Sequence, residues 1–164
     1  MDTLDVELLA ALREHPRAGA LELSRITGVA RATVSARLQR LEENGLITGY
    51  GPDVDVAAAG FGVQAFVTLE IAQGALDAVR ADLEAIPGVL EAYATTGSGD
   101  VLCRVAARSH EALQQVLVDL NRSSAVVRST SVVALSELVP WRTLPLLRSA
   151  ATPGAGRARP VPEH

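Results

Sequence analysis

The amino-acid sequence predicts an α+β protein with an N-terminal helix-turn-helix domain and a C-terminal ferredoxin-like βαββαβ sandwich domain. In residues 1–48, apolar side chains recur at the three- and four-residue spacing of helices. From residue 62 the spacing of apolar residues predicts the order strand, helix, strand, strand, helix, strand, which is typical of the ferredoxin-like arrangement. The glycine-containing residues 49–61 break any helix and predict a linker strand between the domains. The second domain is expected to span residues 62–147. Residues 148–164 are expected to form a disordered tail.

Three helices are expected in the first domain. The first carries a leucine stripe and ends before Pro16, because a residue that precedes proline is driven out of the α region. The second is short, over about residues 20–27, and Gly28 stops it as a glycine after a helix does. The third runs over about residues 31–44 and is apolar on one face only. The leucine stripe of the first helix comprises Leu4, Leu8, Leu9 and Leu12.

The second domain is expected to hold four strands and two helices. The strands are predicted at residues 63–71, 89–95, 101–106 and 126–138. The helices are predicted at residues 76–86 and 109–120, where apolar side chains return to helical spacing. The segment 139–147, with Pro140 and Trp141, is expected to pack as a short tail, with Trp141 as a packing or interface anchor.

The composition excludes several classes of protein. The chain has 164 residues, 48% hydrophobic and 21% charged, and no apolar run long enough to span a bilayer. Its acidic start is unlike a signal peptide, so a cytoplasmic protein is expected. A lone cysteine, Cys103, excludes an internal disulfide framework and predicts a buried small residue rather than a nucleophile. All 15 basic residues are arginine, which excludes lysine-dependent catalysis and a phosphate-binding P-loop.

The third helix has the character of a helix that reads DNA. Such a helix fits the major groove, and its exposed N-terminal half meets base edges. Arg31 is suited to guanine, Ala32 or the Thr33 methyl group to thymine, and Arg37 and Arg40 to neighbouring phosphates. The alternative is a three-helix scaffold whose arginines only solvate its surface. The predicted DNA-binding residues are Arg31, Ala32, Thr33, Ser35, Arg37, Gln39 and Arg40.

The order and spacing of many short segments closely resemble the leucine-responsive regulator/AsnC (Lrp/AsnC) family. The N-terminal segments are Leu4–Leu9, Glu22–Ser24, Thr33–Ser35, Arg37–Leu38, Leu41–Glu42 and Gly45–Tyr50. The C-terminal ones are Gly60, Val67, Pro87–Val89, Thr96–Asp100 and Ser129–Ser131. No single segment is decisive, but together they cover about residues 3–138.

The resemblance implies a transcriptional regulator whose partners are promoter or operator double-stranded DNA and an amino acid or related small-molecule effector. It also implies a homodimer and a higher homo-oligomer such as an octamer, with the effector between subunits. No enzyme activity, cofactor, metal ion or membrane partner is expected. Carried over by position, the effector-binding residues are Thr96, Gly97, Ser98, Gly99 and Asp100, with a facing contribution from Ser129, Ser131 and Val132.

The chemistry of the turn at residues 96–100 agrees with such a role. Asp100 can pair with the ammonium group of an amino acid, and the backbone at Gly97 and Gly99 can approach its carboxylate because no Cβ intervenes. The same residues also form ordinary hairpin turns, in which Asp100 would only cap the backbone. The family turn usually carries an acidic residue and an aromatic where Ser98 and Gly99 stand, which leaves the identity of the effector open.

Other interpretations rest on weaker signals. A ligand-binding or enzymatic ferredoxin-like domain with an accessory helix-turn-helix is the main alternative, but no paired carboxylates or nucleophile elbow is visible. An RNA-binding sheet needs central aromatics, for which only Phe66 and Tyr93 are candidates. A structural assembly protein without ligand is the third alternative.

The histidines, His15, His110 and His164, are scattered and predict no metal site. Ala30 stands where many family members carry a capping serine, which should weaken the start of the third helix.

Overall fold

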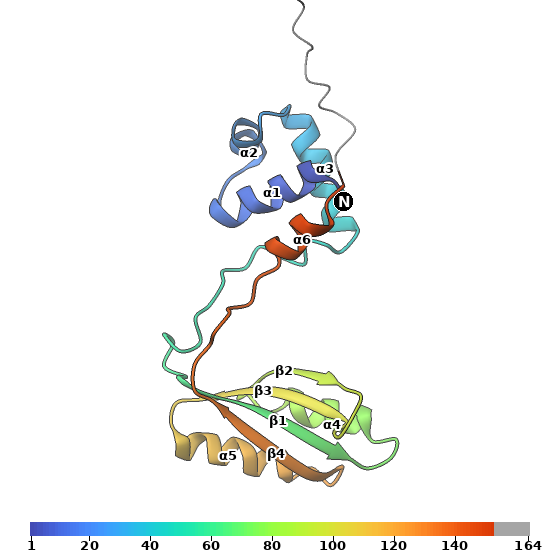
Figure 1. The fold of residues 1–164 in the computed structure, drawn as a ribbon, viewed down its shortest axis with the longest axis vertical. Helices are drawn as coiled ribbons and strands as arrows, with labels where there is room; N and C mark the ends of the chain where they lie inside the picture. Colours follow the sequence, from blue (N-terminus) through green and yellow to red (C-terminus); the bar gives the residue numbers. More distant parts are fainter. Residues whose placement is uncertain (153–164) are drawn as a thin grey trace, which may run out of the picture. The chain divides into compact units, whose positions relative to one another are not determined.

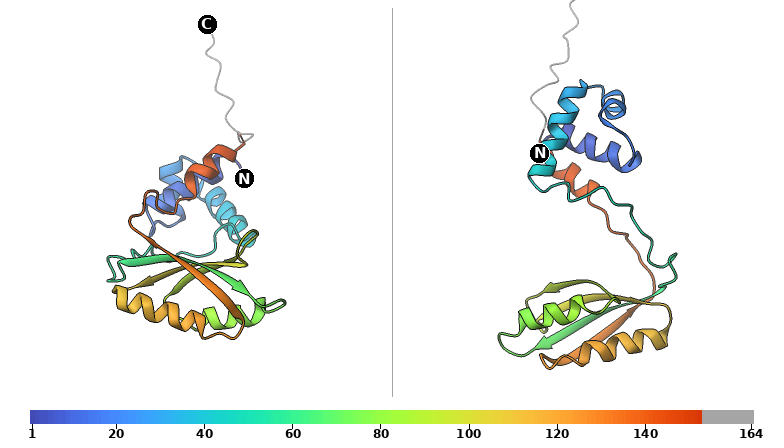
Figure 2. Two further views of the ribbon diagram at one scale, coloured as in Figure 1. Left: turned by 60° about the horizontal axis from the view of Figure 1, so that its bottom comes forward. Right: turned by 180° about the vertical axis from the view of Figure 1, so that it is seen from behind.

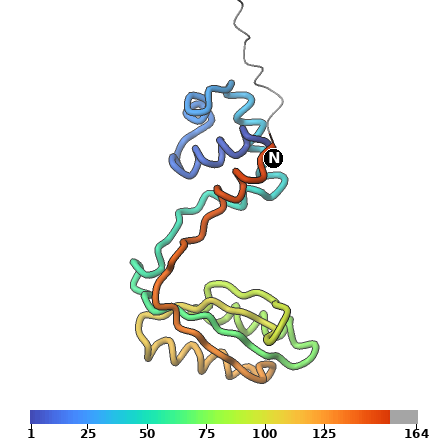
Figure 3. The backbone as a smooth tube through the Cα atoms, viewed as in Figure 1, coloured from blue at the N-terminus to red at the C-terminus, as the bar shows by residue number. Residues whose placement is uncertain are grey.

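The computed structural model describes residues 1–152, which form two compact units (Figure 1). One unit comprises Met1–Pro52 together with the chain from Pro140 onward, and the other comprises Asp53–Val139. The chain therefore passes between the units twice, and the backbone tube in Figure 3 shows both connections. The part of the predicted tail at residues 153–164, with His164, lies outside the described residues.

The first unit contains the three expected helices, α1 (Thr3–Glu14), α2 (Ala20–Thr27) and α3 (Arg31–Glu43). Asp2 caps α1 in a reciprocal capping box with Asp5, which satisfies two backbone N–H groups at the start of the helix. Gly28 ends α2 in the left-handed conformation, with φ of 71°, and its N–H donates to the Ser24 carbonyl. The core residues that hold the helices together are Leu8, Ala11, Leu23 and Val34.

A fourth helix, α6 (Leu144–Ala150), belongs to this first unit and contacts α1. We expected the sheet domain to continue to residue 147 and the tail to be disordered from residue 148, but residues from Pro140 onward group with the N-terminal helices. Leu144, Leu147 and Ala151 are half-buried at a spacing of three and four residues, which gives the segment one apolar side to bury. This side of α6 packs against α1.

The second unit is a four-stranded antiparallel sheet in the order β2-β3-β1-β4, with two helices. Figures 1 and 2 show both helices on the same face of the sheet. This is the ferredoxin-like βαββαβ arrangement that the sequence predicts. Its elements in chain order are β1 (Val63–Ile71), α4 (Leu76–Glu84), β2 (Val89–Ala94), β3 (Val101–Ala107), α5 (His110–Asn121) and β4 (Val126–Ala134).

The two faces of the sheet differ in burial because side chains alternate along each strand. On the helix-covered face, Val67 and Cys103 are fully buried in the core. On the open face, Phe66 lies between Arg104 of β3 and Val132 of β4 in the strand register. Phe66 and Val132 are 44% and 64% exposed, so this face presents apolar groups that neither helix of the second unit covers.

The expected linker strand at residues 49–61 does not form. Within the described chain these residues contain no strand, and residues 56–60 fold into a turn. The Asp55 carboxylate accepts hydrogen bonds from the N–H groups of Ala57 and Ala58, at 2.9 and 3.0 Å, which favours a turn over an extended strand. A strand also needs a neighbour for its backbone groups, and this segment pairs with none in the described protomer.

Candidate functional site

The N-terminal half of α3 is exposed on one side and anchored on the other. Val34 and Leu41 are buried, whereas Arg31, Ala32 and Thr33 are exposed. Ser35 and Gln39 are also exposed, and the Gln39 amide donates to Glu43 at 2.8 Å. The structure therefore leaves the residues predicted to meet base edges open to solvent.

The turn between α2 and α3 is fixed by short-range hydrogen bonds. The Ser24 hydroxyl donates to the Val29 carbonyl at 2.6 Å, and Gly28 supplies the positive φ that the turn requires. Ala30 precedes α3 and gives it no side-chain cap, as its identity predicts. The start of α3 is thus positioned by its neighbours rather than by its own cap.

Two arginines of α3 pair with carboxylates at the start of α1. The Nη1 atom of Arg37 lies 2.6 Å from each carboxylate oxygen of Asp2 and 2.8 Å from Oδ1 of Asp5. The Nη2 atom of Arg40 lies 2.8 and 2.9 Å from the two oxygens of Asp5. Asp5 is fully buried, whereas the side chains of Arg37 and Arg40 are 24% and 52% exposed. We call these four residues the carboxylate–arginine cluster.

The cluster changes the interpretation of the two arginines, which the sequence assigned to phosphates. Arg37 lies against Asp2 and Asp5 instead of standing free, and only Arg40 remains half exposed. The hydrogen bond from Arg37 lowers the pKa of Asp2, against the opposing effect of desolvation. The hydrogen bonds to Asp2 and Asp5 likewise raise the pKa of Arg37. Both partners of this pair therefore stay charged near neutral pH.

The turn at residues 96–100 is tied to the end of β1. The Asp100 N–H donates to the Leu69 carbonyl at 2.9 Å, and its carboxylate accepts from the Ile71 N–H at 2.8 Å. Gly99 is buried, and a side chain there would collide with the methyl group of Thr68. Gly97 has φ of 117°, a conformation that favours glycine. Thr96, Gly97, Ser98 and Asp100 are exposed.

The strand register brings only part of the facing set toward this turn. Ser129 pairs with Leu69, the residue whose carbonyl receives the Asp100 N–H, and its hydroxyl donates to Asn121 at 3.0 Å. Ser131 pairs with Val67, further along β1. Val132 pairs with Phe66 and so lies on the opposite face of the sheet from Ser129. Within one protomer, therefore, the eight predicted effector residues do not close around a single pocket.

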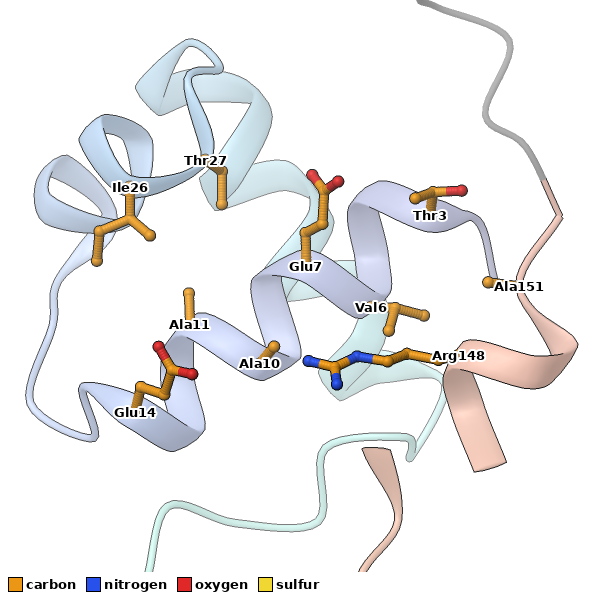
Figure 4. Close-up of a pocket in the computed structure, with 10 residues that line it drawn as sticks. All are labelled: Thr3, Val6, Glu7, Ala10, Ala11, Glu14, Ile26, Thr27, Arg148 and Ala151. Carbon is orange, nitrogen blue, oxygen red and sulfur yellow. The ribbon is translucent and has the colours of Figure 1, made fainter. Parts of the chain in front are cut away.

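Two hollows occur elsewhere in the described chain. The larger, of about 560 Å³, lies against α1 in the first unit, where Arg148 of α6 extends over it (Figure 4). The smaller, of about 300 Å³, lies between α4 and β2. Neither is lined by the residues predicted to bind DNA or effector.

Comparison with known families decides the identity of the chain. The family model of the Lrp/AsnC ligand binding domain matches residues 64–144, and that of a winged helix-turn-helix DNA-binding domain matches residues 1–48. The chain belongs to the Lrp/AsnC family. This Lrp/AsnC protein is 32% identical over 146 residues to the regulatory protein AsnC of Escherichia coli K12, covering 88% of this chain and 95% of that one. It is also 32% identical over 142 residues to the transcriptional regulator AldR of Mycolicibacterium smegmatis, covering 84% and 83%.

Solved structures agree. E. coli AsnC superposes on this Lrp/AsnC chain with a TM-score of 0.82 at 28% identity, covering 88% of this chain and 99% of that one. The regulator NMB0573 of Neisseria meningitidis, solved in complex with L-Met, gives a TM-score of 0.80 at 26% identity, covering 91% and 99%. The relatives are transcriptional regulators, so the protein is a helix-turn-helix regulator and not an enzyme.

Cys103 and Trp141 are the remaining residues of this Lrp/AsnC protein that the sequence singles out. Cys103 is buried, and burial raises the pKa of its thiol to about 11, which keeps it protonated. Trp141 is exposed. Within residues 1–152, no three side chains of metal-ligating type gather closely enough to hold an ion, and no helix is long and apolar enough to cross a membrane.

Proposed function

We propose that the protein regulates transcription by binding promoter or operator DNA through α3, under the control of an amino acid or related metabolite. The observation that carries the DNA-binding part is the exposed N-terminal half of α3 in a helix-turn-helix whose other face is buried. A homodimer would present two such helices about one DNA turn, roughly 34 Å, apart over a pseudo-palindromic site.

The residues of α3 divide into base-reading and backbone-contacting groups. Arg31, Ala32 and Thr33 are free to meet base edges, with Ser35 and Gln39 beside them. Arg40 donates to Asp5 through one guanidinium nitrogen, so its remaining N–H groups are available for a phosphate. Arg37 is less exposed, and its main contribution is to hold α3 against α1.

Salt-dependent DNA binding tests this assignment. Arg31→Ala should lower affinity for selected sites and relax sequence preference, because it removes a base contact. Arg40→Ala should weaken binding to all sequences and flatten the slope of log K against log salt by about one. Arg122→Ala, at an exposed position on the sheet unit, is the matched control and should leave binding unchanged. If Arg31→Ala and Arg40→Ala also bind as wild type, α3 is not the reading helix.

The effector is proposed to bind at the turn of residues 96–100, with Ser129, Ser131 and Val132 contributed across a subunit contact. The match to a ligand binding domain and the L-Met complex of the Neisseria relative support a small-molecule effector of this class. One carboxylate oxygen of Asp100 accepts the hydrogen bond from the Ile71 N–H, and the other oxygen can accept one from an ammonium group. Val132 lies on the opposite face of its own sheet, so its contribution requires a second subunit.

Thermal unfolding with the proteinogenic L-amino acids, L-methionine among them, tests the effector site. A ligand at 100 times its Kd should stabilise the wild type by about 2.7 kcal/mol, a shift of several degrees. Asp100→Asn keeps an acceptor for the Ile71 N–H but removes the charge, so it should lose this shift while its unliganded Tm changes little. A variant that still shifts fully with ligand would place the site elsewhere.

Self-association is proposed through the open face of the sheet. Phe66, Tyr93 and Val132 expose apolar surface there, and Leu135 and Leu138 are almost fully exposed just after β4. Contiguous exposed apolar surface of this kind marks an interaction site, and a second copy of the same face is complementary to it. A dimer formed this way is the expected building block of a higher homo-oligomer such as an octamer, and effector binding would change its assembly or the spacing of its reading helices.

A further inference from the structure

The DNA-binding unit contains a part that neither family match includes. The helix-turn-helix match ends at residue 48 and the ligand binding domain match ends at residue 144. Residues 145–152 lie beyond both, yet the compact unit that holds α1, α2 and α3 includes them. We call residues 140–152 the C-terminal clasp.

The clasp is fastened to the first residues of the chain. The carbonyl of Thr152 accepts hydrogen bonds from the Thr3 N–H at 3.1 Å and from the Thr3 hydroxyl at 3.2 Å. The Thr152 hydroxyl donates to the Met1 carbonyl at 3.3 Å, and Asp2 and Thr152 form a parallel bridge. Figure 4 shows Ala151 beside the start of α1 and Arg148 beside Val6 and Ala10.

The residues that the clasp holds also hold the reading helix. Asp2 lies between Met1 and Thr3, both of which bond to Thr152, and its carboxylate pairs with Arg37 of α3 at 2.6 Å. Asp2 also donates its N–H to Asp5 at 2.9 Å, and Asp5 binds Arg40. The hydrogen bonds of Thr152, the backbone of residues 1–3 and the Asp2–Arg37 pair therefore connect the clasp to α3.

The Asp2 carboxylate lies 2.6 Å from Arg37, and a contact this short depends on a fixed backbone around Asp2. The clasp supplies that constraint on one side, and the capping box supplies it on the other.

From these contacts we infer that the C-terminal clasp is a positioning element of the DNA-reading head, which keeps Asp2 paired with Arg37 and so sets the position of α3. This inference rests on the proposed DNA binding and adds a part of the chain remote in sequence to the DNA-binding unit. Residues 135–139 connect β4, the strand that carries Ser129 and Ser131, to the clasp.

The substitution Thr3→Pro tests the inference selectively. It removes both the N–H and the hydroxyl that bond to Thr152. Thr3 is the first residue of α1, where proline is well tolerated, and the extended conformation of Asp2 suits a residue before proline. Thr3→Val keeps the N–H and serves as the matched control. Removal of residues 144–164 opens the clasp independently, with removal of residues 153–164 as its control.

DNA affinity is measured on a duplex of about 30 base pairs, selected by the wild-type protein from a random pool and long enough for two half-sites. Thr3→Pro and the longer truncation should each weaken binding about fivefold relative to their controls, the effect of losing one ordinary hydrogen bond. In an Asp2→Asn background, which keeps the cap but removes the charge, Thr3→Pro should have less than about a twofold further effect, since both changes break one coupling.

A DNA-free readout separates this inference from the proposed function. The pKa of Asp2, followed by NMR, should move from its lowered value toward the ordinary 3.8 in Thr3→Pro but not in Thr3→Val. If no variant binds DNA but the Asp2 shift occurs, the proposed function fails and the clasp stands. If Thr3→Pro leaves both the DNA affinity and the Asp2 pKa unchanged, the clasp does not act through the Asp2–Arg37 pair. The same conclusion follows if the loss of DNA affinity in the double variant equals the product of the two single losses.

Discussion

Asp5 shows how one side chain can hold together elements distant in sequence. At the start of a helix, an acidic residue is ordinarily explained by the helix dipole and by capping. Asp5 does cap, but it also places a fully buried carboxylate between Arg37 and Arg40. Burial of a charge without partners is costly, so the two arginines make this burial possible.

The sequence indicated the chemical types at these positions but not their pairing. Arg37 and Arg40 lie three residues apart on one helix, which suits two phosphates as well as two carboxylates. What decides between them is that Asp2 and Asp5 lie on the same side of α1, facing α3, a relation that follows from helix packing rather than from local pattern. The local signal for this pairing is the presence of Asp2 and Asp5, three residues apart, at the start of one helix.

Replacement of Asp5 by asparagine should destabilise the DNA-binding unit. The change keeps the size of the side chain but leaves Arg37 and Arg40 without their shared carboxylate, so the free energy of unfolding should fall by about 1–3 kcal/mol. Urea denaturation, followed by circular dichroism, measures this change. Glu7→Gln, at an exposed position of the same helix, should change stability by less than about 0.5 kcal/mol. Equal stability in the two variants would show that the carboxylate–arginine cluster contributes nothing.

At the scale of elements, local signals predicted most boundaries closely. Gly28 ends α2 and the Pro87–Gly88 pair follows α4, as expected from their backbone preferences, and the strand order matches the predicted sandwich. The linker at residues 49–61 failed as a strand because the partner of a strand is not a local property. For the same reason, Val132 entered the predicted effector set from its place in the chain, whereas the register assigns it to the other face.

The uncapped start of α3 offers a stabilising substitution. Ala30 is exposed, with φ of −60° and ψ of 142°, and makes no side-chain hydrogen bond to the helix. Ala30→Ser should add a cap and raise the free energy of unfolding by about 1 kcal/mol, seen as a higher Tm. Ala36→Ser, the same change within α3, should instead cost about 0.5 kcal/mol because serine is the poorer helix former. If both variants behave alike, the start of α3 does not limit stability.

At the scale of the whole molecule, the open face of the sheet determines the proposed assembly. Phe66→Asp places a charge at the centre of this face and should shift the protein from dimer or higher oligomer toward monomer, measured by light scattering after size-exclusion chromatography. Val118→Asp introduces the same charge at an exposed position of α5, on the helix-covered side of the sheet, and should leave the assembly unchanged. If Phe66→Asp leaves the assembly intact, the open face is not the contact.

The assignment of the C-terminal residues could not have been made from local pattern. Leu144, Leu147 and Ala151 predict a short amphipathic element, but an apolar stripe does not state which core it covers. The sequence predicted that the sheet domain extends to residue 147, whereas the hydrogen bonds of Thr152 place this segment with α1. Only contacts between residues about 150 positions apart carry that information.

The return of the chain to its own beginning has a consequence for how the protein comes apart. A protease that cleaves once within residues 53–62 severs one connection between the units, but the liberated helices would still grip α6 on the other fragment. A single nick should therefore leave both fragments travelling together under native conditions and separating only in denaturant. Two cuts, the second near residue 139, would be needed to release the reading head.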